Sequence, residues 1–358
     1  MIQSKIRIGL VGLGFGQKVH VPALRLDERC EVAGVCGRRL AQTKEAAERL
    51  GIDRAYAHWT ELVHDEDIDA VTIAVEPARQ PEIALAALAA GKAVFCEKPL
   101  GMTGEQVEAM VAAAHASDLA HMIDFECPEI SVWKQARTVL QSGEIGQLRH
   151  LTVKWDVQAP ARPGGQNGCW KGRAHLGGGV LNTFGSHVLH YLQWLAGDVV
   201  RLSARLMMGN EEADQGDTLA LMHVEFASGA LALVSLSQHS MHHNRHRVEI
   251  FGDQGRLVLE NTALDYIDGF RLFCHPENSP ESEMTVETAS HRGDGRVVVV
   301  GRLFHRFLDW IELGAPATPD FVEGARVQAL LDAARDSDAQ RDWVQVPEFA
   351  RIEHTFTM

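Results

Sequence analysis

Short apolar runs alternate with longer amphipathic segments along the first third of the chain. The runs are rich in Val, Ile and Ala and end at Gly or polar residues, as is typical of buried strands. Regular alternation of strands with helices predicts a parallel, doubly wound α/β sheet of the Rossmann type. We predict strands at 6–11, 31–36, 70–75, 93–96 and 121–124, and helices at about 19–26, 43–50, 60–64, 81–90 and 105–117.

The pattern changes after residue 124. One helix is predicted near 129–141, and several strands then follow with little helix between them, which indicates an α+β domain with a large, mostly antiparallel open sheet. Two domains are therefore expected, residues 1–124 and 125–358. Strands are predicted at 148–157, 199–208, 218–226, 231–236, 248–251 and 257–259, surface loops at 162–168 and 276–283, and closing helices at 303–313 and 321–334.

Composition limits the classes of function. The 358 residues suit two domains, and 48 Asp and Glu against 34 Lys and Arg give a net charge of −14. This balance argues against a nucleic-acid or membrane-surface partner. The longest apolar runs fall short of the roughly 20 residues that span a bilayer, and the N-terminal residues lack the parts of a signal peptide. With six scattered cysteines, these features predict a reducing, cytoplasmic location.

A glycine-rich loop follows the first predicted strand. Gly12, Gly14 and Gly16, with Phe15 between the last two, lie where a strand turns into a helix. Glycines there allow a tight turn and close approach of a pyrophosphate, and the helix N-terminus supplies N–H donors. The third glycine of the usual G-x-G-x-x-G spacing would fall at Gln17, so a ligand-free turn stays open as the alternative.

The second predicted strand ends at Gly37, followed by Arg38 and Arg39. Enzymes that use NAD usually carry an acidic residue here to bind the ribose 2′-hydroxyl, whereas a guanidinium pairs with a 2′-phosphate. The two arginines therefore favour NADP over NAD as the cofactor. The alternative interpretation is a solvated helix start with no role in binding.

The segment Phe95-Cys96-Glu97-Lys98-Pro99-Leu100 resembles the Gfo/Idh/MocA family, which includes glucose–fructose oxidoreductase and inositol dehydrogenase. Further segments are similar to this family and occur in its order along nearly the whole chain. They are residues 11–16 with His20 and 22–24, 142–146, 177–181 with 185–187, 249–255, and 321–332.

The resemblance implies a Rossmann domain followed by a domain whose open sheet often mediates oligomerisation, here into a dimer or tetramer. It implies hydride transfer between the nicotinamide C4 and a secondary alcohol or ketone of a small polar substrate, commonly a sugar or cyclitol. Family members place the segment that matches Glu97 and Lys98 beside the nicotinamide, with the lysine near the reacting oxygen. Pro77, after the third predicted strand of the N-terminal domain, joins the candidate cofactor-binding residues.

Lys98 and His187 are the candidate catalytic residues. Hydride delivery to a ketone leaves an alkoxide that needs positive charge and a proton. Lys98 can supply both, and His187 can donate a hydrogen bond to the same oxygen and titrate near neutral pH. The alternatives are a surface lysine before a turn proline and a histidine satisfied within the core.

Three positions depart from the family pattern. Dehydrogenases of the family commonly carry Asp where this chain has Thr183, an acidic residue where it has His190, and His where it has Pro81. Thr183 stays a candidate polar contact at the site, but it cannot stabilise an imidazolium at His187 as a carboxylate would. The chain is then either an enzyme with a variant site or a non-catalytic, dinucleotide-binding regulator. A third alternative is a dehydrogenase of a non-sugar substrate such as a dihydrodiol.

Trp170 and Lys171, with Glu126, are candidate substrate-binding residues, because a polyol offers hydroxyls and an apolar face. A plain loop around 166–173 is the alternative. No metal site is predicted. The histidines at 239, 242, 243 and 246 are irregularly spaced, with no Cys or carboxylate between them, and are expected in an exposed loop or at a sheet edge.

Overall fold

The computed structural model describes residues 5–158, 170–208, 214–240, 243–287 and 293–347. The chain forms two compact units. Unit 1 comprises Met1–Glu126 with His291–Ala325, and unit 2 comprises Cys127–Ser290 with Arg326–Met358. The first break lies close to the expected domain boundary at 124. The segment 291–325 differs from the expectation, because the sequence analysis grouped it with the second domain.

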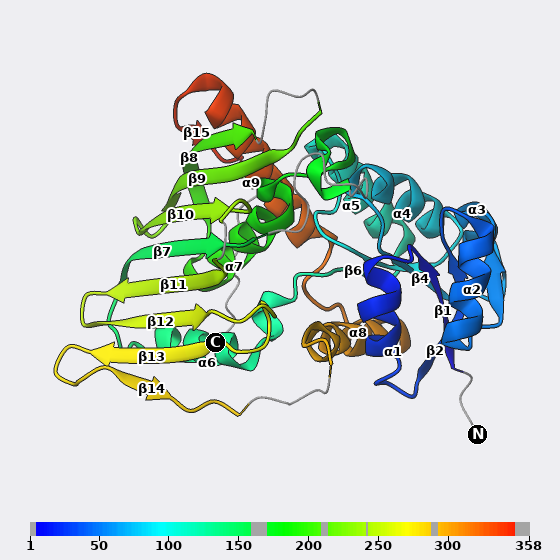
Figure 1. Ribbon diagram of the computed structural model, residues 1–358, viewed down its shortest axis with the longest axis horizontal. Coiled ribbons are helices and arrows are strands. Elements are labelled where there is room, and N and C mark those ends of the chain that lie inside the picture. Colours follow the sequence, from blue (N-terminus) through cyan, green and yellow to red (C-terminus); the bar gives the residue numbers. More distant parts are fainter. Residues whose placement is uncertain (1–4, 159–169, 209–213, 241–242, 288–292, 348–358) are drawn as a thin grey trace. The chain divides into compact units, whose positions relative to one another are not determined.

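Unit 1 contains a six-stranded sheet whose order is β3-β2-β1-β4-β5-β6, with all neighbours parallel (Figure 1). This confirms the predicted doubly wound sheet. The order reverses between β1 and β4, which is where such sheets bind ligands at the carboxyl ends of their strands. The strands are β1 Ile6–Val11, β2 Cys30–Cys36, β3 Arg54–Tyr56, β4 Ala70–Ile73, β5 Ala93–Cys96 and β6 His121–Ile123.

Helices cover the sheet of unit 1, and one cluster shows how they are held. Leu10 of β1 and Val35 of β2 pack against Val21, Ala47 and Ile52, all buried. Fully burying a Val or Leu side chain contributes about 1.5–3 kcal/mol. The helical segments are η1 Gly16–His20, α1 Val21–Leu24, α2 Leu40–Leu50, α3 Trp59–Val63, η2 Pro77–Arg79, α4 Gln80–Ala89, α5 Gly104–Ser117 and α8 Arg296–Leu313.

Helix α8 belongs to unit 1 because its apolar face packs there. Phe304 stacks on Phe95 of β5 with ring centroids 4.2 Å apart, and Phe307 lies 5.8 Å from the same ring. At the helix's other end, Arg29 pairs with both Asp309 and Glu312. The sequence analysis predicted only residues 303–313 of this helix, and the structure begins it at Arg296.

Unit 2 contains a nine-stranded sheet in the order β14-β13-β12-β11-β7-β10-β9-β8-β15, antiparallel except for the β7–β10 pair. This confirms the predicted large, mostly antiparallel sheet, and α6, α7 and α9 lie over one of its faces (Figure 1). The strands are β7 Leu148–Asp156, β8 Val199–Met208, β9 Asp217–Phe226, β10 Leu231–Ser237, β11 Arg245–Gly252, β12 Gly255–Asn261, β13 Arg271–Pro276, β14 Ser282–Met284 and β15 Val344–Gln345. The remaining segments are η3 Cys127–Glu129, α6 Ser131–Ser142, η4 Trp170–Gly172, η5 Ala174–Leu176, η6 Leu181–Gly185, α7 Ser186–Ala196 and α9 Phe321–Gln340.

The sequence analysis missed the short strands β3, β13, β14 and β15, and β14 begins within the stretch 276–283 that it assigned to a loop. These strands carry few consecutive apolar residues. None of the helices in the described part of the chain combines the length and apolar character needed to cross a membrane.

Candidate active site

The glycine loop lies at the carboxyl end of β1, at the point where the strand order reverses. Gly12 has φ +112°, and a Cβ there would lie 2.1 Å from the carbonyl oxygen of Ala74. A Cβ at Gly16 would lie 2.5 Å from Leu10 Cδ1, so Gly16 lets the first helix approach the strand. Among the described residues, a Cβ at Gly14 would meet nothing within 4 Å. The fold itself therefore leaves open the place where a pyrophosphate would approach, and the loop fits a dinucleotide.

The compressed G-x-G-x-G spacing has a local explanation. The first helix begins at Gly16, three residues before the expected Val19, and its first turn is a π-helix that runs to His20. Gly16 thereby takes the close-packing role of the third fingerprint glycine. Gln17 instead accepts a hydrogen bond from Arg49 Nη2 at 2.6 Å.

Replacing Gly12 by alanine is expected to abolish dinucleotide binding and to destabilise unit 1. The left-handed conformation alone costs about 1–2 kcal/mol, and the contact with the Ala74 carbonyl adds to it. Thermal unfolding and NADPH titration would measure both losses. Gly14→Ala is the matched control, because its Cβ meets no described atom: it should keep wild-type stability while binding NADPH more weakly. Equal melting temperatures for the two variants would contradict this account.

Arg38 and Arg39 lie at the carboxyl end of β2, both exposed, and Arg39 precedes the first turn of α2. Arg39 Nε donates to Gln42 Oε1 at 3.0 Å. The preceding Gly37 is within close packing distance of Leu13 of the glycine loop, since a Cβ at Gly37 would lie 2.6 Å from Leu13 Cδ1. The backbone before the two arginines therefore lies beside the loop, so that both side chains start close to the place where a dinucleotide would bind.

Pro77 opens η2 after β4 and is buried. In the next helix, α4, the buried Gln80 donates from Nε2 to the carbonyl oxygen of Pro99 at 2.6 Å. This bond ties the Glu97–Pro99 segment, which follows β5, to the helix that follows β4. Lys98 itself is partly exposed. Pro77, Glu97 and Lys98 thus share the carboxyl edge of the sheet with the glycine loop.

A buried histidine joins two carboxyl groups at this edge. His20 Nδ1 lies 2.7 Å from Thr72 Oγ1, and its Nε2 lies 3.1 Å from Glu97 Oε1 and 3.5 Å from Asp124 Oδ2. The His20 and Asp124 side chains are at most 1% exposed and Glu97 is 13% exposed. Phe15, Phe95 and Phe304 surround the imidazole edge-on at 5.3–5.6 Å. Three ionisable groups therefore share one small, dry space.

The three groups shift one another's pKa. Burial by itself would lower the pKa of His20, but the hydrogen bonds to Asp124 and Glu97 and the negative charge of Glu97 outweigh it and raise this pKa to about 9. Burial opposes ionisation of Glu97, yet His20 and then Lys98 hold the pKa of Glu97 below its ordinary value. Burial, and next the charges of Glu97 and Glu126, raise the pKa of Asp124 well above the usual range. The arrangement favours an imidazolium, a carboxylate and a protonated carboxyl group.

The sequence analysis used His20 only as part of a family signature and did not consider Asp124. A signal was present, because Glu97 and Asp124 each follow a buried strand directly. The carboxyl ends of adjacent parallel strands meet at one edge of the sheet. Thr72 and His20 come from β4 and η1, the elements that line the same edge.

Thr183 and His187 lie in unit 2, one turn apart on η6 and α7. Asp217 fixes this helical start, since its Oδ2 accepts the Leu181 N–H at 2.7 Å. The Thr183 hydroxyl donates a hydrogen bond to the Gly179 carbonyl at 2.7 Å. His187 is buried, with its ring 6.2 Å from Trp155 and 6.5 Å from Tyr266. The roles expected of Thr183 and His187 stay predictions.

Trp170 and Lys171 form part of η4, which is bound to the start of the same helical segment. The Gly179 N–H donates to the Lys171 carbonyl at 2.9 Å. Trp170 is half-buried and Lys171 exposed, so these two candidates lie near Thr183 within unit 2. The preceding part of the candidate loop, 166–169, is outside the described residues. Glu126 is a buried residue of unit 1, close enough to Asp124 to raise its pKa.

The histidines that the sequence analysis grouped together do not share one environment: His246 is buried, whereas His243 is exposed. His246 is a core residue that stacks on Trp155 at 4.0 Å, and the Tyr191 hydroxyl lies 3.0 Å from its Nε2. Burial lowers the pKa of His246 to about 3, so the imidazole is neutral. The sequence analysis placed it in an exposed loop or edge, which is wrong. His243 lies 3.6 Å from Asp156, and His242 is outside the described residues.

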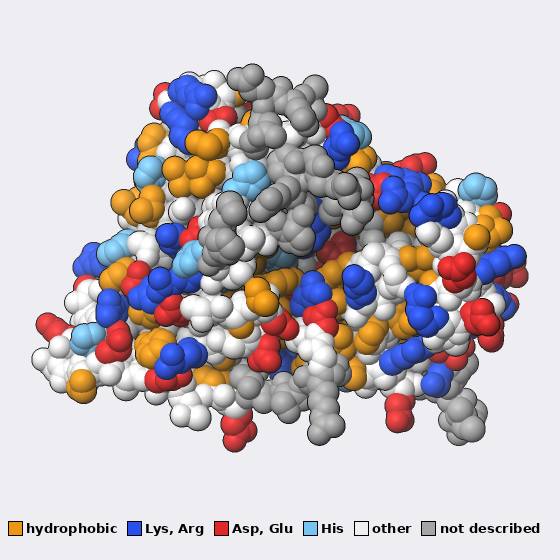
Figure 2. Space-filling model, in the orientation of Figure 1, with side chains coloured by type: hydrophobic (Ala, Val, Ile, Leu, Met, Phe, Trp, Pro, Cys, Tyr) orange, Lys and Arg blue, Asp and Glu red, His pale blue; other side chains and the backbone are white. Residues whose placement is uncertain are grey.

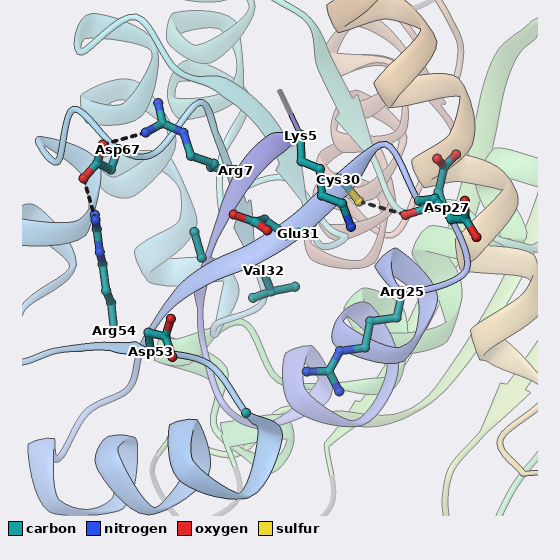
Figure 3. A pocket seen from close by; sticks show the side chains of 13 residues that line it. Lys5, Arg7, Arg25, Asp27, Cys30, Glu31, Val32, Asp53, Arg54 and Asp67 are labelled. Atoms are coloured by element: carbon teal, nitrogen blue, oxygen red, sulfur yellow. Dashed lines mark hydrogen bonds and ion pairs between the residues drawn. The ribbon is translucent and has the colours of Figure 1, made fainter. Parts of the chain in front are cut away.

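A separate pocket of about 600 Å³ opens at the other end of the parallel sheet of unit 1 (Figure 3). Lys5, Arg7, Glu31 and Asp53 line it, and all precede or begin strands. Because dinucleotides bind at the carboxyl ends of such strands, this pocket is not the cofactor site. Arg7 is already paired there with Asp67.

Comparison with known proteins agrees with this geometry. Residues 6–125 match a model described as the oxidoreductase family with an NAD-binding Rossmann fold, and residues 133–258 match one described as the GFO/IDH/MocA C-terminal domain. An uncharacterized oxidoreductase of Synechocystis sp. is 30% identical over 97% of this chain and 98% of its own length. A myo-inositol 2-dehydrogenase of Thermotoga maritima is 25% identical over 72% of this chain and 75% of its own.

A solved structure shows the same fold. Levoglucosan dehydrogenase in complex with NADH and L-sorbose superimposes with a TM-score of 0.86 at 24% identity, over 96% of this chain and 100% of that one. That protein therefore holds a nicotinamide dinucleotide and a sugar on the architecture described above.

Proposed function

This chain belongs to the Gfo/Idh/MocA family of oxidoreductases, and we propose that it uses NADP to oxidise a secondary alcohol, or reduce a ketone, of a sugar or cyclitol derivative. One observation carries the proposal: an open glycine loop, Arg38 and Lys98 all border the carboxyl edge of the parallel sheet. When bound, the nicotinamide exchanges hydride at C4. We expect the protein in the cytoplasm, which the five buried free thiols of the described residues support.

Lys98 is proposed to hold the reacting oxygen. Its ammonium group stabilises the alkoxide that develops during ketone reduction and returns a proton to it. Glu97 and the Gln80–Pro99 hydrogen bond fix the segment on both sides of Lys98. A preorganised donor of this kind costs little reorganisation during the reaction.

His187 and Thr183 are proposed to act on the reacting oxygen, and Trp170 and Lys171 are proposed to bind the substrate. His187 would donate a hydrogen bond to the substrate oxygen, and the Thr183 oxygen can accept one, because its proton is given to Gly179. Thr183 itself cannot carry the negative charge that a carboxylate at this position would bring to a His187 imidazolium. The variant site is therefore expected to favour ketone reduction, with Lys98 as the main proton donor.

Fluorescence titration with NADPH and NADH, followed by turnover on sugars, cyclitols and their keto forms, tests this function. We expect tighter binding of NADPH and turnover on at least one polyol or keto-polyol. Failure to bind either cofactor would overturn the proposal.

The alternative function, a non-catalytic dinucleotide-binding regulator, is favoured by Thr183 alone. It requires tight NADPH binding and no turnover across the panel. Turnover of a dihydrodiol, but of no substrate with several ring hydroxyls, would instead indicate a dehydrogenase of apolar substrates.

We also propose that the uncovered face of the large sheet pairs two copies of the chain. Strand alternation normally places polar residues on a solvent face, yet Leu221, Leu231 and Leu233 are 42–50% exposed on one face of β9 and β10. Figure 2 shows apolar side chains gathered over β8–β10. Met207 and Trp343 extend this apolar patch. Contiguous exposed apolar surface of this kind marks an interaction site.

Replacing Leu233 by glutamate is expected to shift the protein toward monomer, because a charge would be buried at the centre of the apolar patch. Sedimentation velocity at several concentrations measures the shift, and a dimer dissociation constant at least about tenfold weaker is expected. Leu264→Glu is the matched control, since Leu264 is 89% exposed and lies outside the patch. An identical sedimentation profile for the two variants would refute the pairing.

A further inference from the structure

Within the buried cluster of His20, Glu97 and Asp124, the function proposed above uses Glu97 alone, and it gives no role to His20 or Asp124. Its members come from three elements and meet at hydrogen-bond distance beneath the segment that carries Lys98. A buried charge is costly unless it is paired. The number of protons bound by these three side chains therefore determines whether their charges are paired.

Glu97 is the link between the cluster and Lys98. Its Oε1 faces His20 Nε2 at 3.1 Å, and its Oε2 accepts the main-chain N–H of Lys98 at 3.3 Å. One carboxylate therefore ties the imidazole to the backbone of the residue that is to meet the substrate. Rotation of the Glu97 side chain would break both contacts together.

We propose that His20 is a positioning residue, held as an imidazolium between Thr72 and Glu97, that keeps Glu97 ionised and so fixes the main chain at Lys98. Nδ1–H is donated to Thr72 Oγ1 at 2.7 Å, and Nε2–H is donated to Glu97. Asp124 retains its proton and stays neutral, so the cluster as a whole carries no net charge. The proposal rests on the function proposed for Lys98.

The groups around the imidazole are consistent with this assignment. Among the described residues that an interaction joins to the imidazole, the ionisable ones are Glu97 and Asp124, and Thr72 is the remaining polar one. Lys98 and Glu126 affect the cluster indirectly: the charge of Lys98 lowers the pKa of Glu97, and the charge of Glu126 raises the pKa of Asp124. The aromatic rings of β5, α8 and the glycine loop fill the rest of the space. A neutral imidazole there would leave the Glu97 carboxylate without its cationic neighbour inside the cluster.

The three groups also have the donor types of a metal site, with ligand atoms within 4.8 Å of one another. The direct Nε2–Oε1 hydrogen bond favours a shared proton over a metal ion, because the ion would have to replace that proton. The experiment distinguishes the two.

His20→Gln is the informative variant, because the amide keeps a hydrogen-bond donor and removes the charge. His121→Gln is its matched control: His121 is another buried histidine of unit 1, packed against Trp310 and Phe321, with Nδ1 hydrogen-bonded to the Leu119 carbonyl. Nitrogen-15 NMR of histidine-labelled protein at pH 8 should show an imidazolium signal that is missing in His20→Gln and retained in His121→Gln. Glu97→Gln should move its titration to lower pH by about one unit or more.

The free energy of unfolding should depend on pH in a way that reports the same charge on His20. The pKa of His20 rises from about 6.5 in the unfolded chain to about 9 in the folded one. The stabilisation is therefore complete below pH 6.5 and is lost as pH rises through 9. Denaturant midpoints should fall over this range in the wild type, and the fall should be smaller in His20→Gln but unchanged in His121→Gln.

For the enzyme, His20→Gln should lower kcat about 10- to 100-fold, as expected for a displaced reacting group, with NADPH affinity and KM within about threefold. Equal kinetic loss in His121→Gln would overturn the positioning role. A neutral His20 at pH 8, or a stoichiometric metal in tag-free protein that His20→Gln loses, would overturn the proton assignment. If the wild type turned nothing over, the proposed function would fail, while NMR and stability would still decide the protonation of His20.

Discussion

Lys98→Ala is expected to lower kcat/KM by about 10²- to 10⁴-fold, the range that a positioned proton donor contributes. The loss should appear in kcat, because the ammonium group acts on charge that develops in the transition state. NADPH affinity should stay within about threefold, since the glycine loop and the arginine pair are proposed to bind the other parts of the cofactor. Single-turnover measurements with NADPH and the best keto substrate would separate the chemical step from product release.

Two further variants sharpen this result. Lys98→Met keeps the length of the side chain without the charge and should lose as much as alanine. Lys44→Ala removes an exposed lysine of α2 and should retain wild-type turnover. A loss below about tenfold in Lys98→Ala would mean that another group protonates the product, and His187 would be the next residue to replace.

Arg38→Ala is expected to raise the NADPH dissociation constant about 10- to 100-fold and to change that of NADH by less than about threefold. A charge-assisted hydrogen bond contributes about 1.5–3 kcal/mol, and only NADPH has the 2′-phosphate that the guanidinium can bind. Fluorescence titration of both cofactors measures the ratio. Arg49→Ala is the control, because Arg49 lies in α2, the helix that follows the arginine pair, and is bonded to Gln17.

Parallel weakening of both cofactors in Arg38→Ala would contradict the NADP assignment. The double variant Arg38→Ala/Arg39→Ala apportions the effect. Arg39 is already engaged with Gln42, so its removal should add less than the removal of Arg38.

The sequence predicted the architecture because most strands carry a clear apolar signal. β1 and β5 are almost entirely buried, and their alternation with helices is typical of a parallel sheet. β3 has only three residues, all of intermediate burial, so no such signal marks it. The π-helical first turn, which begins at Gly16 and not at the expected Val19, was also missed, because the sequence before Val19 carries no apolar pattern that marks a helix.

The residues of the candidate site also fall into those that the sequence suggested and those that only the fold brings together. Local motifs led to the predictions for the glycine loop and Lys98, because each of these motifs is a run of a few consecutive residues. The His20 cluster could not be read from local motifs, because its members lie up to 104 positions apart, at 20 and 124, and only the strand order brings them together. For Thr183, the sequence shows a hydroxyl group, but it does not show that this hydroxyl donates a hydrogen bond to the Gly179 carbonyl.

The return of the chain to unit 1 through α8 has a consequence for biosynthesis. Phe304 and Phe307 pack against Phe95 on β5, yet the ribosome makes them after eight of the nine strands of the large sheet, β7 to β14. The nascent Rossmann unit therefore leaves part of its apolar surface open while some 170 further residues, from 127 to 295, are synthesised. The ion pairs of Arg29 with Asp309 and Glu312 likewise cannot form until these residues of α8 have been synthesised. Synthesis of unit 1 therefore begins first, but its fold can be completed only after α8 has been made.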